Sequence, residues 1–105
     1  MRPIPPKLRD ALSRDESMKK CIYKDCGGMP EWEHAMIYQG KQVNEKWAIV
    51  PVCVYHHRGE GLDKNYNIHC ALQRATQKDL EKFNRTNWTR LKVFLSKKYD
   101  YQKHS

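Results

Sequence analysis

Residues 21–61 read CIYKDCGGMPEWEHAMIYQGKQVNEKWAIVPVCVYHHRGEG, and this stretch decides the fold. It contains two short pairs of metal-binding side chains: Cys21 and Cys26 flank four residues, and Cys53 and His56 flank two. A structural zinc ion takes four such ligands in a tetrahedron, usually as two short-range pairs that the fold brings together. The spacing therefore predicts a zinc site formed by all four side chains.

Three other side chains are candidates for the fourth ligand of this site: His57, His69 and Cys70. A different interpretation is a thiol enzyme that uses Cys53 or Cys70 beside a histidine, which requires an exposed thiolate of low pKa. A thiolate bound to zinc is not free to act as a nucleophile, so we favour the zinc site.

The composition provides little aliphatic core, and a zinc site would explain how such a chain folds. Leu, Ile, Val and Phe account for only 19 of the 105 residues, and the formal net charge is +8. A chain with under about 20% of these residues and a high net charge lies at the border of intrinsic disorder. In such a chain the free energy of zinc binding becomes folding free energy. We expect one small α+β domain.

The expected cellular location follows from the length of the apolar segments. The longest apolar run spans residues 47–55 and contains Pro51, whereas a membrane helix needs about 20 apolar residues. The first residues contain no apolar stretch of signal-peptide length. We therefore expect a cytoplasmic protein without a membrane partner, in which the cysteines are reduced and available to a metal.

The charge is distributed unevenly over three segments of this domain. Residues 1–20, a Pro-rich arm with a short helix, carry +3; the core at 21–73 carries −1; the helical segment at 74–105 carries +6. Such basic flanks suit a polyanion, because Lys and Arg that neutralise phosphates release counterions. We expect a nucleic acid as the partner, since this charge suits DNA and RNA alike. A merely solubilising surface is the alternative.

Residue patterns predict the elements around the two ligand pairs. We expect a short helix within 7–20, a strand at 32–38 and a second strand at 48–54, separated by a polar loop. Pro51 favours an edge position for the second strand. A helix is expected to begin near residues 55–57.

The C-terminal segment carries two helical signals. Thr76 and Asp79 have the spacing of a capping box, and a break is expected at 84–87. Beyond it, an apolar stripe of helical spacing predicts a helix packed on the core: Trp88, Leu91, Leu95 and Tyr99. Three lysines lie off this stripe and can face solvent or the phosphates of a nucleic acid: Lys92, Lys97 and Lys98. A second copy of the chain, in a homodimer, is another candidate partner of these helices.

The order of residues in 21–61 resembles the HNH endonucleases, the ββα-metal or His-Me finger nucleases, in their zinc-stapled form. A Cys pair precedes Glu33-His34, a strand then leads to the second pair, and His57-Arg58 follows directly. The resemblance implies a zinc-stapled ββα-metal finger with flanking helices. The flanks themselves resemble no family, and the short basic form looks like small nucleases of phages and prophages.

The resemblance implies a metal-dependent DNA endonuclease or nickase that hydrolyses phosphodiester bonds, with duplex or branched DNA as its partner. His34 would be the general base that activates water, while Glu33 and His57 would hold Mg²⁺ or another divalent cation. That cation stabilises the leaving oxygen and the charge on the phosphate. Arg58 would contact a neighbouring phosphate.

Two positions depart from the family's pattern. Where the family has a central Asn that orients the general base, this chain has Trp47 or Ala48, and Asn44 is the nearby candidate. Where the finger helix often adds a metal ligand, Glu60 is the candidate, and Asn65 is a more distant one. The alternative function is a non-catalytic zinc-finger module that binds nucleic acid or a protein partner.

Overall fold

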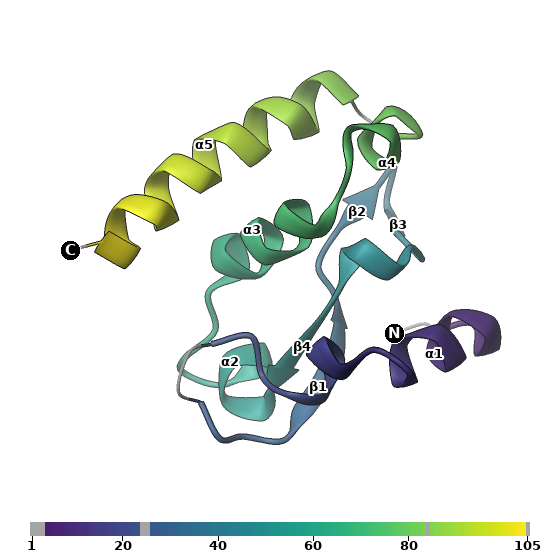
Figure 1. The fold of residues 1–105 in the computed structure, drawn as a ribbon, viewed down its shortest axis with the longest axis vertical. Coiled ribbons are helices and arrows are strands. Elements are labelled where there is room, and N and C mark those ends of the chain that lie inside the picture. The colour runs from purple at the N-terminus through teal and green to yellow at the C-terminus, as the bar shows by residue number, and fades with distance from the viewer. Residues whose placement is uncertain (1–3, 24–25, 84, 105) are drawn as a thin grey trace.

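The computed structural model describes residues 4–23, 26–83 and 85–104. These residues form a small α+β domain in which two separate two-stranded antiparallel sheets are surrounded by helices. The longest helix, α5 (Arg85–His104), lies along one side of the domain, and α1 (Pro6–Ser13) lies at the opposite end (Figure 1). The expected α+β class is confirmed at this level.

The central sheet pairs β1 (Pro30–His34) with β4 (Ile49–Cys53). The register places Glu33 opposite Val50. Every residue of β4 is buried, as expected for a strand of β-branched residues that is covered on both faces. Pro51 is tolerated because a two-stranded sheet leaves one side of β4 unpaired, as the sequence predicted.

The strand predicted at 32–38 is divided in two, and this part of the prediction was wrong. After β1 ends, β2 (Ile37–Tyr38) forms a separate hairpin with β3 (Lys41–Gln42). The turn between them has positive φ angles at Gln39 and Gly40, of 52° and 77°. Two successive residues with positive φ are typical of a tight two-residue hairpin. The expected polar loop therefore contains a short strand, followed by a 3₁₀ helix, η2 (Lys46–Ala48).

The helix expected within 7–20 is also divided. α1 is followed by a 3₁₀ helix, η1 (Glu16–Lys19), and the Asp15 carboxylate accepts a hydrogen bond from the backbone N–H of Ser17. This N-terminal region covers the sheet through a small apolar cluster that contains Leu12, Met18 and Ile49.

Three helices lie between β4 and α5 along the chain, and the first of them contains His56. α2 (Val54–Arg58) begins directly after β4, and α3 (Lys64–Arg74) begins with the Asp63 side chain accepting a hydrogen bond from the N–H of Tyr66. α4 (Gln77–Glu81) begins at the predicted capping box, in which Thr76 and Asp79 each bond the other's backbone. The helical break lies at residues 82–83, before the predicted 84–87. Residues 85–87 already belong to α5, so that part of the prediction was wrong, and Asn84 lies outside the described residues.

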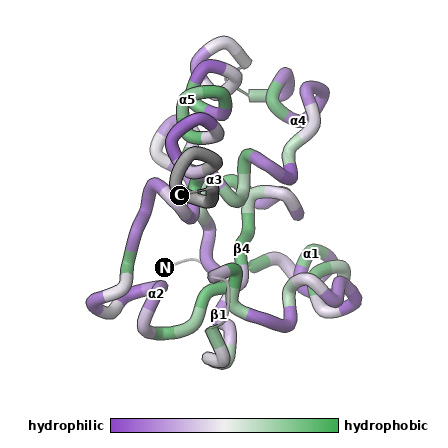
Figure 2. The backbone as a smooth tube through the Cα atoms, turned by 60° about the vertical axis from the view of Figure 1, so that its left-hand side comes forward, coloured by the Kyte–Doolittle hydropathy of each residue, from purple (hydrophilic) through white to green (hydrophobic). Residues whose placement is uncertain are grey.

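The main core lies between β4, α3 and α5, and β4 forms a continuous apolar segment in the middle of the domain (Figure 2). The predicted stripe on α5 faces this core: Trp88, Leu95 and Tyr99 are buried and Leu91 is partly buried. Among the helices of the described residues, none is long and apolar enough to cross a membrane.

Candidate functional site

The two ligand pairs meet at the end of the central sheet. The thiol sulfurs of Cys21, Cys26 and Cys53 and an imidazole nitrogen of His56 all lie within 4.8 Å of one another. In the described part of the chain this is the one group of three or more Cys, His, Asp or Glu side chains arranged to hold an ion.

The distances fit a tetrahedral ion. Nδ1 of His56 lies 3.6, 3.7 and 3.2 Å from the sulfurs of Cys21, Cys26 and Cys53, and the last two sulfurs are 3.6 Å apart. A tetrahedral zinc ion with Zn–S bonds of about 2.3 Å has ligand atoms about 3.8 Å apart. The four side chains therefore form a Cys₃His group that could bind a metal such as zinc.

The local backbone is shaped around these ligands. A Cβ atom on Gly28 would lie 2.5 Å from Cβ and 3.0 Å from Sγ of Cys53, so this position accepts only glycine without a shift. The ring of Tyr23 stacks on that of His56, with centroids 3.7 Å apart and planes 9° apart. The stacked ring holds the imidazole in the orientation that points Nδ1 at the sulfurs.

Metal binding requires thiolates, and the surroundings of two of the sulfurs shift their pKa values in opposite directions. A hydrogen bond from the backbone N–H of His56 lowers the pKa of Cys53 to about 6. Burial raises the pKa of Cys21, whose sulfur accepts a hydrogen bond from the backbone N–H of Cys53.

The other candidates for the fourth ligand lie elsewhere. His57 bonds a carboxylate, and the ring of His69 packs against that of Tyr99 at 5.1 Å. Burial raises the pKa of Cys70 to about 11, so this thiol stays protonated near neutral pH. That is the opposite of what a thiol nucleophile needs.

A second set of polar side chains lies beside this cluster, where β1 faces α2. Nδ1 of His57 lies 2.8 Å from Oε1 of Glu31, and its Nε2 lies 4.0 Å from Oε1 of Glu33. An ionised carboxylate only accepts hydrogen bonds, so Nδ1 is the donor and Nε2 of neutral His57 carries the lone pair. The hydrogen bond from His57 is also the main reason that the pKa of Glu31 is lowered.

Glu33 is held by a chain of hydrogen bonds from two other elements. The amide nitrogen of Asn67, on α3, donates to Oε2 of Glu33 at 2.8 Å. The amide oxygen of Asn67 accepts a hydrogen bond from the Tyr23 hydroxyl at 3.3 Å. Burial raises the pKa of Glu33, and the nearby His57 and Asn67 oppose that shift. Tyr23 therefore contacts both His56 and Asn67, the residue that holds Glu33.

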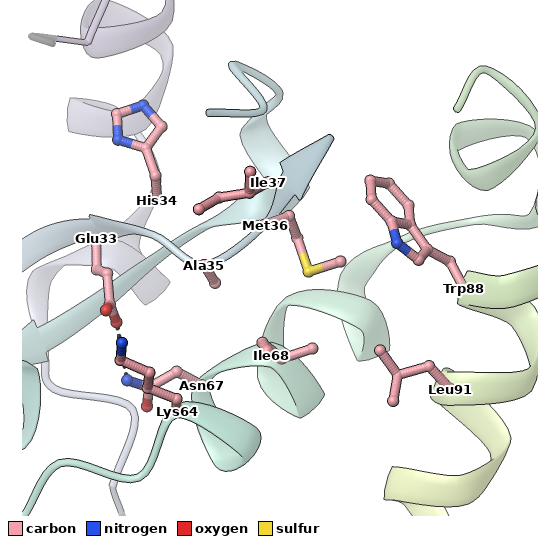
Figure 3. A pocket seen from close by; sticks show the side chains of 10 residues that line it. All are labelled: Glu33, His34, Ala35, Met36, Ile37, Lys64, Asn67, Ile68, Trp88 and Leu91. Atoms are coloured by element: carbon pink, nitrogen blue, oxygen red, sulfur yellow. Dashed lines mark hydrogen bonds between the residues drawn. The ribbon is translucent and has the colours of Figure 1, made fainter. Parts of the chain in front are cut away.

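His34 emerges from the opposite face of β1, as adjacent residues on a strand do, and points away from Glu33 (Figure 3). Its Nε2 lies 2.8 Å from the amide oxygen of Asn44. Asn44, the candidate for the missing central Asn, is thus in contact with the candidate base. With Nε2–H donating to that oxygen, Nδ1 is the nitrogen that can accept a proton.

The remaining predicted site residues are more dispersed. Arg58 is 67% exposed and donates to Oε2 of Glu31 at 2.9 Å. Lys97 and Lys98 are exposed on α5, whereas the Lys92 ammonium donates to the Ala75 carbonyl at 2.8 Å. Glu60 lies in an exposed turn beyond α2 and not on the helix, because α2 ends at Arg58.

Sequence reasoning missed two side chains of this site, Glu31 and Asn67. Glu31 could have been found, because alternate residues of a strand share a face and Glu33 had been selected. Asn67 contacts Glu33, which lies 34 positions earlier in the chain, and no local sequence pattern predicts that contact.

Comparisons with known proteins do not identify a relative. No protein-family model matches the chain, and no similar curated protein or solved structure was found.

Proposed function

We propose that this chain is a zinc-stapled, metal-dependent endonuclease that hydrolyses phosphodiester bonds in DNA. The observation that carries the proposal is the 4.0 Å approach of Glu33 Oε1 to His57 Nε2, next to the Cys₃His group. A cation about 2.1 Å from two ligand atoms holds them about 3.0 Å apart at a right angle and about 4.2 Å apart in a straight line. The observed separation falls within this range.

A divalent cation bound by this pair would polarise a phosphoryl oxygen and stabilise the leaving oxygen. Only two side chains would bind it, which leaves coordination positions for water and for the phosphate. The imidazole ligand favours Mn²⁺ or another transition-metal ion over Mg²⁺, which prefers oxygen. Glu31 would fix the tautomer of His57 so that its lone pair faces Glu33, as carboxylates do for metal-binding histidines.

In this proposal His34 is the general base. Asn44 holds its Nε2, and Nδ1 has no hydrogen-bond partner among the described residues, so it can accept a proton from water. In-line displacement places the attacking and leaving oxygens on opposite sides of phosphorus. A base and a cation on opposite faces of β1 suit this arrangement when the phosphate lies at the strand edge.

DNA as the substrate is proposed from the charge of +8 and from the basic residues near the site. Arg58 is exposed and shares the Glu31 carboxylate with His57, so a phosphate that binds Arg58 is brought next to the proposed cation. Lys97 and Lys98 would add contacts to more distant phosphates.

A plasmid assay tests the proposal. The zinc-loaded protein should nick supercoiled DNA with Mn²⁺ or Mg²⁺, and EDTA should stop the reaction. His34→Ala should abolish cleavage while the fold and the zinc content stay unchanged. The side chain of His34 bonds Asn44 and none of the four side chains of the Cys₃His group. Cleavage by His34→Ala at the normal rate would remove this residue from the mechanism.

The alternative function is a zinc-finger module that binds nucleic acid without cutting it. The observation that favours it is that the side chains of His34 and Glu33 point away from each other (Figure 3). This alternative predicts DNA binding that weakens steeply with salt, and no cleavage with any divalent cation.

A further inference from the structure

A cleft of about 360 Å³ begins at Glu33 and runs between two parts of the domain (Figure 3). The segment that joins β1 to β2 forms one wall, and α3 and α5 form the other. The end near the proposed cation is polar, with Glu33, Lys64 and Asn67. The far end is apolar and is lined by Met36, Ile37, Ile68, Trp88 and Leu91.

The apolar end leaves hydrophobic surface in contact with solvent. Ile37 is 64% exposed, and Ile68 and Leu91 are only partly buried. Apolar side chains gathered along a groove form a surface of the kind that ligands use. Trp88 lines the cleft, and Figure 3 shows its indole nitrogen on the side of the cleft.

We propose that this cleft receives an unpaired nucleobase of the DNA strand whose phosphate lies at Glu33 and His57. The inference rests on the proposed function and adds the form of DNA that the site accepts. One sugar separates a base from its phosphate, so a strand bound at Glu33 places a base in the adjoining space. Apolar walls suit the flat faces of a base, and the Trp88 N–H suits an acceptor on its edge.

A paired base does not fit this site. In a duplex the faces of each base are covered by stacking, and only edges are displayed in the grooves. The cleft is concave and holds the volume of roughly a dozen water molecules, which is enough for one base but not for a base pair. The site therefore selects a single-stranded or extruded nucleotide, as enzymes and proteins that bind unstacked bases do. Lys64, at the polar end, lies where it can contact the backbone of that strand.

Binding measurements test this proposal without cleavage. The zinc-loaded His34→Ala protein is titrated into a fluorescent single-stranded oligonucleotide and into the duplex of the same sequence, at the same salt concentration. Adding Leu91→Trp fills the cleft and should lower the ratio of single-strand to duplex affinity about tenfold, within the range for loss of one base contact. Val93→Trp places the same ring on the exposed face of α5 and should leave the ratio unchanged.

A second variant guards against misfolding of the first. Ile37→Ser changes a side chain that is 64% exposed and should lower the same ratio with no loss of zinc. Unchanged ratios in Leu91→Trp and Ile37→Ser would overturn the nucleobase site, while metal-dependent cleavage of duplex DNA would leave the endonuclease proposal standing. A protein that binds neither form of DNA would contradict both.

Discussion

Substituting Gly28 by alanine places a methyl group where Cys53 already lies. The new Cβ would be 2.5 Å from Cβ and 3.0 Å from Sγ of Cys53, whereas ordinary contacts begin at 3.4 Å. The loop that contains Gly28, or β4, must therefore move by about 1 Å. Overpacking of this kind costs about 1–3 kcal/mol. A shift of that size also exceeds the roughly 0.2 Å tolerance of metal–ligand distances.

Gly27→Ala is the matched control. A Cβ at Gly27 meets nothing within 4 Å, and Gly27 does not have a positive φ. Alanine there should be neutral, or stabilise by about 0.4–1 kcal/mol through the unfolded chain. Alanine should thus weaken zinc binding at position 28 but not at the neighbouring position 27.

The assay is competition for zinc between each variant and a chromogenic chelator, followed by urea unfolding of the zinc-loaded protein. A cost of 1–3 kcal/mol in the folded, metal-bound state corresponds to an affinity loss of about 5- to 150-fold. Gly28→Ala should show that loss, and Gly27→Ala should match the unsubstituted protein. Equal zinc affinity in the two variants would refute the idea that Gly28 makes room for Cys53 in the Cys₃His group.

Three further predictions concern other parts of the molecule. In the proposed mechanism, Asn44→Ala should lower kcat of plasmid cleavage by about 10- to 100-fold with little change in KM, because His34 loses its orienting bond; an unchanged kcat would show that Asn44 does not orient His34. Cys70 should react slowly with iodoacetamide at pH 8 and faster as the pH rises toward 11, because only the thiolate reacts; rapid labelling at pH 8 would contradict this. Thr76→Ala should lower the unfolding free energy by about 1 kcal/mol in urea titrations, because α4 loses its cap; no change would mean that the capping box contributes nothing.

The four side chains of the Cys₃His group were predictable because their spacing is a local property. Cys21 and Cys26, and then Cys53 and His56, are each close enough in sequence to share one ion whatever the rest of the chain does. Their meeting needed only a fold that joins the two pairs, and the pairing of β1 with β4 supplies it. The choice of His56 over His57 was settled by the direction of α2, which turns His57 toward Glu31.

The parts that escaped prediction depend on long-range contacts or on unusual backbone angles. The β2–β3 hairpin contains only two residues in each strand, too few for an alternating pattern, and its turn places Gln39 at a positive φ. The contact of Asn67 with Glu33 joins α3 to β1, and only the packed structure specifies it. Burial of Glu33, which raises its pKa, likewise arises from packing and not from neighbouring residues in the sequence.

Calorimetric titration of Mn²⁺ into the zinc-loaded protein tests the central claim most directly. We expect one Mn²⁺ per chain in addition to zinc, lost in Glu33→Gln and retained in Glu45→Gln, whose carboxylate pairs with Lys82 away from the site. No binding beyond zinc, or equal binding in both variants, would contradict the assignment of a cation to Glu33 and His57.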